Sequence, residues 1–434
     1  MDRPIKVWNV LPPLLAVLLG LGILRLAGTG QIGAAGTDQT GHAGTATASS
    51  GPPYAVLVSQ PAHGHYSVLL VDLQGRVVAQ ASGSMPRCCL GGPDGPYSGP
   101  NAIVGAPHCC VIPGAAVTRP LVVSASATRV YYLDGDTQIR ALSPSGPAGL
   151  VTRVPGGPHT LAGFTVSPDD RRIAVAVRDY LPWAKHPNFV DGANLQLYVE
   201  DLHGGGHHDL IFATSFPTLP TNTMEWPLAW HQNALVVAVG NGEAQNDPWQ
   251  NPYAAAAYHV ASAATGLRQA TVCDQGSPSG PIVDAGTACW SHTGTLYRED
   301  WAGGCQALGT PMNNSLAFGT TDGALSPDGS QVALPDPARH AVRLLGAHGA
   351  STTLPGAGAY PLGWIDARHL VVASDLNFKS NSSLDILDTH TKAVTPIDVS
   401  ATLFSPARDI FLSSLPAHQT GAAAASLPNP GTCP

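Results

Sequence analysis

Charged residues are scarce in this sequence. Asp, Glu, Lys and Arg make up 12% of the 434 residues, and the formal net charge is -8. No stretch of the chain gathers Lys or Arg, whereas proteins that bind nucleic acid carry such a basic patch to neutralise phosphates. The composition therefore predicts that nucleic acid is not a partner.

Helical patterns are missing after residue 30. Apolar residues alternate with polar ones or form short runs that end at Gly, Pro, Asn or Asp, and the chain contains 48 Gly and 39 Pro. Alternation with a period of two is typical of strands, and Gly and Pro mark the turns between them. The chain is therefore predicted to be an all-β protein.

The common catalytic motifs are absent as well. We find no G-x-S-x-G, no H-E-x-x-H, no Walker loop and no usable dinucleotide fingerprint. Each of these motifs supplies a nucleophile, a metal site or a phosphate cradle. The sequence therefore assigns no catalytic residue, no resident metal and no cofactor.

An apolar span stands at the N-terminus. Arg3 and Lys6 precede apolar residues that run from about Val7 to Leu24. Positive charge ahead of an apolar span directs the following chain out of the cytoplasm. We expect an uncleaved membrane anchor with the body outside the cytoplasm, or else a cleaved signal peptide that leads to secretion.

The composition divides the chain into four parts. Residues 1–26 form the anchor or signal segment, and 27–53 are a linker of Gly, Ala and Thr. A flexible linker of this length reaches roughly 30 Å. Residues 54–415 form the folded body, and 416–434 form a C-terminal tail.

The body repeats one pattern. "VSPDDRRIAV" at 166–175 and "LSPDGSQVAL" at 325–334 each join an apolar residue, a polar turn and a second apolar run. The copies recur about every 40 residues, with two longer intervals, and one four-stranded propeller blade needs about that length. Their apolar anchor residues are Val123, Val166, Trp230, Trp290, Leu325, Trp364 and Phe404.

This pattern resembles the TolB-type propeller repeat, a WD-repeat-like family. The likeness is sharpest at 167–170 (Ser-Pro-Asp-Asp) and 326–329 (Ser-Pro-Asp-Gly), and as a pattern it covers about 54–415. The Ser-Pro at 405–406 is followed by Ala407 rather than Asp. The resemblance implies a propeller with a binding role, and it carries no catalytic residues to transfer.

We predict a single β-propeller of seven four-stranded blades, with six or eight as alternatives, preceded by the N-terminal apolar helix. The first strands of the body and the strands near residue 410 are expected to share one blade and so close the ring. A ring of stacked sheets buries both faces of each sheet and leaves few exposed edges. A β-sandwich is the competing fold, but it does not require the same turn seven times.

Three long insertions are predicted to gather on one face of the ring. Segments 179–194 and 240–254 join the second and third strands of their blades, and 82–114 joins blade 1 to blade 2. In an antiparallel meander these connections leave the same face. Loops on a rigid scaffold often carry function. The candidate binding residues there are Trp183, Lys185, His186, Asp191, Glu243, Asp247, Trp249 and Tyr253.

Eight cysteines in an exported chain indicate disulfides. Cys88 with Cys110 and Cys89 with Cys109 would staple one long insertion. These four cysteines with His108 are alternatively a site for copper or zinc. The remaining disulfide candidates are Cys273 with Cys305, and Cys289 with Cys433.

These observations predict a noncatalytic binding or scaffold module outside the cytoplasm. Its looped face would meet a protein, peptide or glycan of the cell envelope, and its N-terminal segment would meet the membrane. The alternative is an enzyme whose active site lies at the central channel, with residues drawn from several blades.

Overall fold

The computed structural model describes most of the predicted body. The described residues are 52–59, 65–86, 122–183, 186–204, 207–216, 225–239, 255, 257–274, 276–291, 294–308, 323–355, 358, 360–374, 383–399 and 409–415. All of them belong to the compact unit Ala46–Pro434. The predicted N-terminal helix, nearly all of the linker and the C-terminal tail lie outside these residues.

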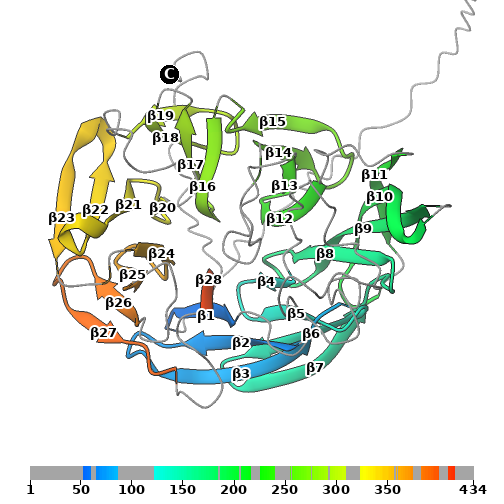
Figure 1. Ribbon diagram of the computed structural model, residues 1–434, viewed down its shortest axis with the longest axis horizontal. Helices are drawn as coiled ribbons and strands as arrows, with labels where there is room; N and C mark the ends of the chain where they lie inside the picture. Colours follow the sequence, from blue (N-terminus) through cyan, green and yellow to red (C-terminus); the bar gives the residue numbers. More distant parts are fainter. Residues whose placement is uncertain are drawn as a thin grey trace, which may run out of the picture. The chain divides into compact units, whose positions relative to one another are not determined.

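The described chain forms seven four-stranded antiparallel sheets arranged in a ring (Figure 1). Apart from two 3-10 turns, η2 (Pro337–Arg339) and η3 (Ala347–Gly349), its regular elements are all strands. Counted from the innermost strand outward, the blades are as follows: blade 1, β28 (Asp409–Leu415), β1 (Tyr54–Ser59), β2 (His65–Val71) and β3 (Val77–Ser84); blade 2, β4 (Val123–Ala125), β5 (Val130–Asp134), β6 (Gln138–Ser143) and β7 (Gly146–Arg153); blade 3, β8 (Thr160–Val166), β9 (Arg172–Trp183), β10 (His186–Asp201) and β11 (His208–Phe216); blade 4, β12 (Glu225–His231), β13 (Ala234–Val239), β14 (Ala257–Ser262) and β15 (Arg268–Val272); blade 5, β16 (Gly276–Val283), β17 (Gly286–Ser291), β18 (Leu296–Glu299) and β19 (Cys305–Ala307); blade 6, β20 (Ala324–Leu325), β21 (Gln331–Asp336), β22 (Ala341–Gly346) and β23 (Ser351–Pro355); blade 7, β24 (Tyr360–Trp364), β25 (His369–Ala373), β26 (Leu384–Asp388) and β27 (Val394–Pro396). The prediction of a seven-bladed all-β propeller is confirmed.

The two ends of the body close the ring by sharing blade 1. Strand β28 pairs antiparallel with β1, from Tyr54↔Leu415 to Ser59↔Asp409. It also contacts the innermost strands of both neighbouring blades, β24 and β4. The predicted closure is therefore confirmed, and the described C-terminal residues supply the innermost strand of that blade.

Packing between blades comes from apolar residues on both faces of each sheet. The largest buried cluster runs through blades 1 to 5 and includes Tyr131, Phe164 and Trp226. Three smaller clusters fill the remaining junctions. This arrangement explains the short apolar runs of the sequence, because strands covered on both faces do not need strict alternation.

Ser-Pro-Asp turns join the first and second strands in blades 3 and 6. In blade 6 the Ser326 hydroxyl donates to Asp328 Oδ1 at 2.6 Å and accepts from the Gln331 amide at 3.1 Å. Ser167 makes the same pair of contacts, with Asp169 and Arg172. The fourth turn residue has positive φ, 70° at Gly329 and 59° at Asp170, and Gly and Asp tolerate that conformation better than most residues.

One copy of the repeat was predicted in the wrong position. Trp364 ends the innermost strand of blade 7, and Trp230 is the penultimate residue of that of blade 4. Each donates its indole N–H to the innermost strand of the preceding blade, at Ala324 O (2.8 Å) and Thr165 O (3.1 Å) respectively. Trp290 instead lies in β17, the second strand of blade 5, and its Nε1 has no hydrogen-bond partner among the described residues.

The error has a physical cause. The innermost strand β16 reads GSPSGPIV, with Gly280 at a φ of 68°, and its pairing with β17 shifts between Ser279 and Val283. Glycine and proline interrupt the alternation of apolar and polar residues by which a strand is recognised in a sequence. The turn after Trp290, where Gly294 N–H donates to Ser291 O, therefore looked like a first-to-second-strand turn.

Replacing Ser326 by Ala should lower the free energy of unfolding by about 1 to 2 kcal/mol, because it removes a buried hydroxyl that satisfies a backbone amide. Ser330→Ala is the matched control, since Ser330 also donates to Asp328 but is exposed. Urea unfolding followed by circular dichroism measures both changes. Equal effects of the two variants would contradict the role assigned to Ser326.

Candidate functional site

The two faces of the ring carry different connections. Neighbouring strands run antiparallel, so first-to-second and third-to-fourth connections lie on one face, here called the turn-bearing face. The turns at 167–171 and 326–330 belong to it. Second-to-third connections and the links between blades lie on the opposite, loop-bearing face. The predicted insertions begin and end on that face, because 240–254 connects β13 to β14 and 82–114 lies between β3 and β4 in the chain.

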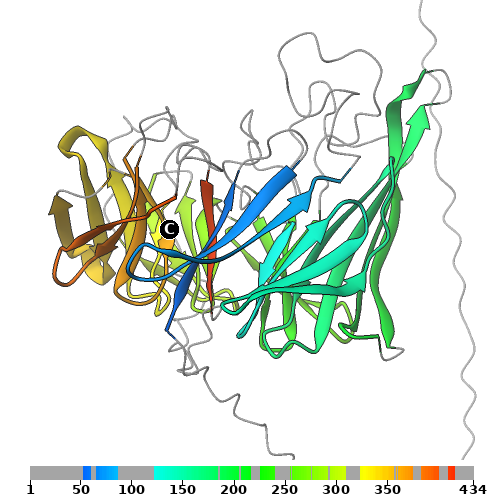
Figure 2. The same cartoon turned by 90° about the horizontal axis from the view of Figure 1, so that it is seen from below.

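The first insertion, 179–194, was predicted as a loop but is largely strand. Strands β9 and β10 continue as a two-stranded ribbon and pair as far as Trp183↔His186. Figure 2 shows these strands extending beyond their neighbours. Alternation is interrupted at Pro182 and Pro187, which disguised the strands in the sequence, and the ladder is correspondingly irregular between His186 and Gly192.

The ribbon extends past the four-stranded part of blade 3. Strand β8 last pairs with β9 at Thr160↔Asp179, and β11 last pairs with β10 at Phe216↔Ala193. From Leu181 to the tip, the described ladder pairs are those between β9 and β10 alone. We call Leu181–Trp183 with His186–Gly192 the ribbon. Its base is anchored by a bond from Thr160 Oγ1 to Asp179 Oδ1 at 2.7 Å.

The predicted binding residues divide into two groups. The backbones of Trp183 and His186 pair at the end of the ribbon ladder, and Asp191 lies in β10 at a register shift. The other five lie outside the described residues: Lys185, Glu243, Asp247, Trp249 and Tyr253. The structure thus places three of the eight on one projecting element, and the binding role of all eight stays a prediction.

Hydrogen bonds hold blade 1 against blade 2 on the loop-bearing face. The Ser84 amide donates to Asp134 Oδ1 at 3.0 Å, and the Gly135 amide returns a bond to Ser84 O at 2.9 Å. Tyr66, fully buried, donates its hydroxyl to Leu133 O. These bonds give the insertion that starts after Ser84 a rigid base.

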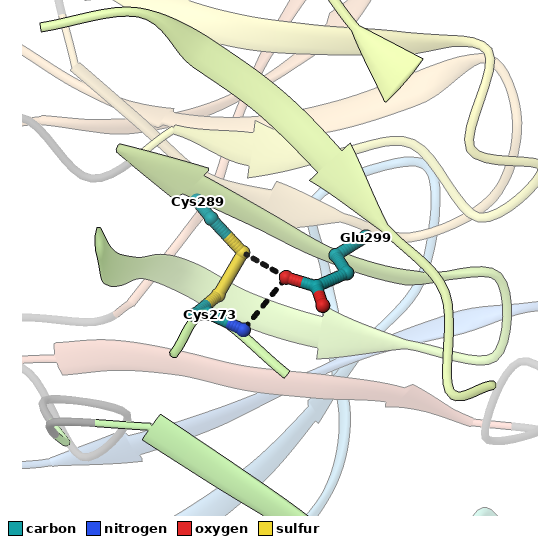
Figure 3. A group of neighbouring side chains, drawn as sticks. All are labelled: Cys273, Cys289 and Glu299. Carbon is teal, nitrogen blue, oxygen red and sulfur yellow. Dashed lines mark hydrogen bonds between the residues drawn. A yellow bond between two sulfur atoms is a disulfide. The ribbon is translucent and has the colours of Figure 1, made fainter. Parts of the chain in front are cut away.

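A disulfide between Cys273 and Cys289 joins blade 4 to blade 5 (Figure 3). The predicted pairing of Cys273 with Cys305 is therefore wrong, and so is that of Cys289 with Cys433. Cys273 follows β15, and Cys289 lies in β17. The prediction failed because it placed the strand with Trp290, β17, innermost in blade 5, whereas β16 is the innermost strand. Cys305 is also disulfide-bonded, to neither of these two. Cys88, Cys89, Cys109, Cys110 and Cys433 lie outside the described residues.

Glu299 lies against this disulfide. Its Oε2 accepts the Cys273 amide at 2.7 Å and lies 3.8 Å from Cys289 Sγ, as Figure 3 shows. The side chains share one face of blade 5, because Glu299 pairs with Thr287 in β17, two residues from Cys289. Burial raises the pKa of Glu299 to about 7, the Cys273 amide opposes this, and the negative charges of Asp300 and Asp274 reinforce it.

Tyr297 completes this junction. It is buried, lies two residues before Glu299 on the same strand face, and pairs with Cys289 across the sheet. Its hydroxyl has no hydrogen-bond partner among the described residues. Burial, with the charges of Glu299 and Asp274, raises the pKa of Tyr297 above its usual value.

Sequence reasoning missed Glu299 and Tyr297. "LYRE" at 296–299 reads as a half-exposed strand, yet all four residues are buried because blades 4 and 6 cover both faces of blade 5. A charged residue inside a short strand near two cysteines was the available signal.

The oxidised protein should lose stability as the pH rises from about 4.5 to about 7. The folded pKa of Glu299 is raised from an ordinary 4.5 to about 7, so in this window the folded state binds more protons than the unfolded state. The contribution of protonated Glu299 to the free energy of unfolding is complete below pH 4.5 and is lost as the pH rises through 7. It amounts to at most about 3 kcal/mol.

Comparison of wild type with Glu299→Gln by urea unfolding from pH 4.5 to 8 measures this contribution. The variant keeps a hydrogen-bond acceptor but has no group that titrates there. Its free energy of unfolding should therefore fall less than that of wild type as the pH rises. Asp209→Asn, which removes an exposed carboxylate, is the control and should leave the slope in place. Parallel curves for wild type and Glu299→Gln would refute the assignment.

No protein-family model matches this chain, and no curated protein matches it. Solved structures with a similar arrangement include dipeptidyl peptidase 4 of Porphyromonas gingivalis, at 11% identity and a TM-score of 0.41, covering 80% of this chain and 60% of that one. Another is an acylaminoacyl peptidase in complex with a chloromethyl ketone, at 11% identity and 0.39, covering 79% and 52%. A third is the dihydro-heme d1 dehydrogenase NirN, at 10% identity and 0.36, covering 82% and 75%.

This chain thus spans 60% and 52% of the lengths of the two peptidases. Within the part of the chain that the structure describes, no helix has the length and apolar character needed to cross a membrane.

Proposed function

We propose that this protein is a noncatalytic binding module that meets its partner through the loop-bearing face. The observation that carries the proposal is the ribbon, which extends beyond the blade on the face from which the long connections leave. The closed ring holds the base of the ribbon in place, and a preorganised binding element loses less entropy on binding. The repeat's resemblance to TolB-type propellers supports the same role.

The ribbon also favours one class of partner. Both of its outer edges extend past the strands that would pair with them, and unpaired strand edges are templates for an added strand. A protein or peptide segment in extended conformation fits this feature better than a glycan does. Trp183 is an aromatic residue at the tip, and aromatic side chains are common anchors at interfaces.

We further propose that the module works at the cell envelope, tethered to the membrane by residues 1–26. The support is the Arg3 and Lys6 charges before the apolar span, and the linker that follows. Fractionation of cells expressing the full chain or a chain without residues 1–26 tests this. The full chain should sediment with membranes and the shortened chain should remain in the cytoplasm, and identical distributions would contradict the proposal.

Site-specific photo-crosslinking in the cells that produce the protein tests the binding face. A benzophenone amino acid at position 183 should give a crosslinked species that excess unlabelled full-length protein suppresses. The same amino acid at Arg171, exposed on the turn-bearing face of the same blade, should give none. A species formed from position 171 alone, or from neither position, would overturn the proposal.

A further inference from the structure

The junction between blades 4 and 5 contains a group of potential metal ligands. Cys273 Sγ, Cys289 Sγ and a Glu299 carboxylate oxygen lie within 4.8 Å of one another, and all three residues are buried. They come from three separate places in the chain, the end of β15, the middle of β17 and the end of β18. The ring therefore brings together two sulfurs and one carboxylate that the sequence keeps apart.

Two features of this junction are unfavourable while the disulfide is closed. Among the described residues Glu299 is a buried carboxylate without a cationic partner, and one backbone amide, that of Cys273, donates to it. Tyr297 places a buried hydroxyl nearby with no hydrogen-bond partner among the described residues. That hydroxyl lies beside the turn 273–276, since a Cβ added to Gly276 would stand 3.1 Å from it.

We propose that reduction of the Cys273–Cys289 disulfide converts this junction into a Zn²⁺ site whose ligands are the two sulfurs and the Glu299 carboxylate. Two thiolates and one carboxylate match the ligand types that zinc prefers, and zinc undergoes no redox change with thiolates. A water molecule would complete the tetrahedral coordination. Zinc would neutralise most of the negative charge that the three ligands carry.

Conversion of the disulfide into a zinc site takes two steps. A dithiol reductant transfers two electrons and two protons to the disulfide, so the Cys273–Cys289 bond breaks, two thiols form and the reductant becomes a disulfide. Zn²⁺ then binds both sulfurs and displaces the two thiol protons to solvent, while Glu299 binds as the carboxylate. Blades 4 and 5 remain joined through the metal instead of the sulfur–sulfur bond.

The test uses the full-length chain in detergent, with the cysteine-rich insertion silenced by Cys→Ala at 88, 89, 109 and 110. The protein is reduced with a phosphine, freed of metal and titrated with Zn²⁺ against a chromophoric chelator, and Co²⁺ absorption then reports thiolate ligands. The silenced protein should bind one zinc ion tightly after reduction and none before it. Adding Cys273→Ala and Cys289→Ala should abolish that binding.

Two further variants keep the test decisive. Glu299→Gln should weaken zinc binding at least tenfold, whereas Asp209→Asn should leave it unchanged. Near-ultraviolet circular dichroism of each reduced protein shows whether it is folded. Zinc binding that survives the loss of Cys273 and Cys289, or no binding by a silenced protein that remains folded after reduction, would overturn the proposal.

Discussion

Deleting residues 409–434 should abolish cooperative folding of the propeller. The deletion removes β28, the innermost strand of blade 1, with its six ladder pairs to β1. It exposes one edge of β1, where Ala55, Val56 and Leu57 are fully buried, and it opens the ring between β24 and β4. The loss should exceed about 5 kcal/mol, which is comparable to the whole stability of a typical domain.

Deleting residues 416–434 alone provides the matched control. Both truncated chains lack Cys433 and the C-terminal tail, so they differ only in β28. Urea unfolding followed by circular dichroism and tryptophan fluorescence should show a cooperative transition for the control and none for the longer deletion. Similar transitions in both chains would mean that β28 does not close the ring.

The double variant Cys273→Ala/Cys289→Ala should lower the free energy of unfolding by about 3 kcal/mol. The disulfide links residues 16 apart, and a loop of that size restricts the unfolded chain by about this amount. The bridge also holds Cys273, whose φ is 60°, against Glu299. Its removal frees a backbone conformation that non-glycine residues seldom adopt.

Unfolding in urea without reductant measures this loss against wild type. A single Cys→Ala change would leave a reactive thiol, so the paired variant is the informative one. Chemical reduction of the wild type should give a loss at least as large, because Cys305 is disulfide-bonded as well. A decrease below about 1 kcal/mol in the double variant would contradict a structural role for the bridge.

The fold could be predicted from sequence because its turns carry their own chemistry. Ser326 and Asp328 form a local hydrogen-bonded turn that does not depend on distant residues, and a repeat of such turns every 40 residues or so implies blades. The closure of blade 1 was predicted because the first strands of the body have the pattern of outer strands and the last ones that of inner strands. Both inferences need only local pattern and connectivity.

The features that sequence analysis did not predict in blade 5 depend on tertiary packing, which no local pattern encodes. The innermost position of β16 and the true partner of Cys273 follow from how blades 4 and 5 stack, as does the burial of Glu299. The ribbon was taken for a loop because prolines interrupt its alternation, although neighbouring strands carry the pairing across them. The errors in blade 5 share one cause, since its strands are stabilised by residues far away in the chain, whereas the ribbon was missed because of its local prolines.

The most direct test of a binding role for the loop-bearing face is to shorten the ribbon. Joining Leu181 to Gly192 through an Asn-Gly turn removes the tip while keeping a hairpin connection. The measurement is the yield of the partner crosslinked from a second benzophenone site at Leu181, with and without the tip. We predict at least a tenfold loss of yield with the unfolding midpoint unchanged, and an undiminished yield would contradict the account.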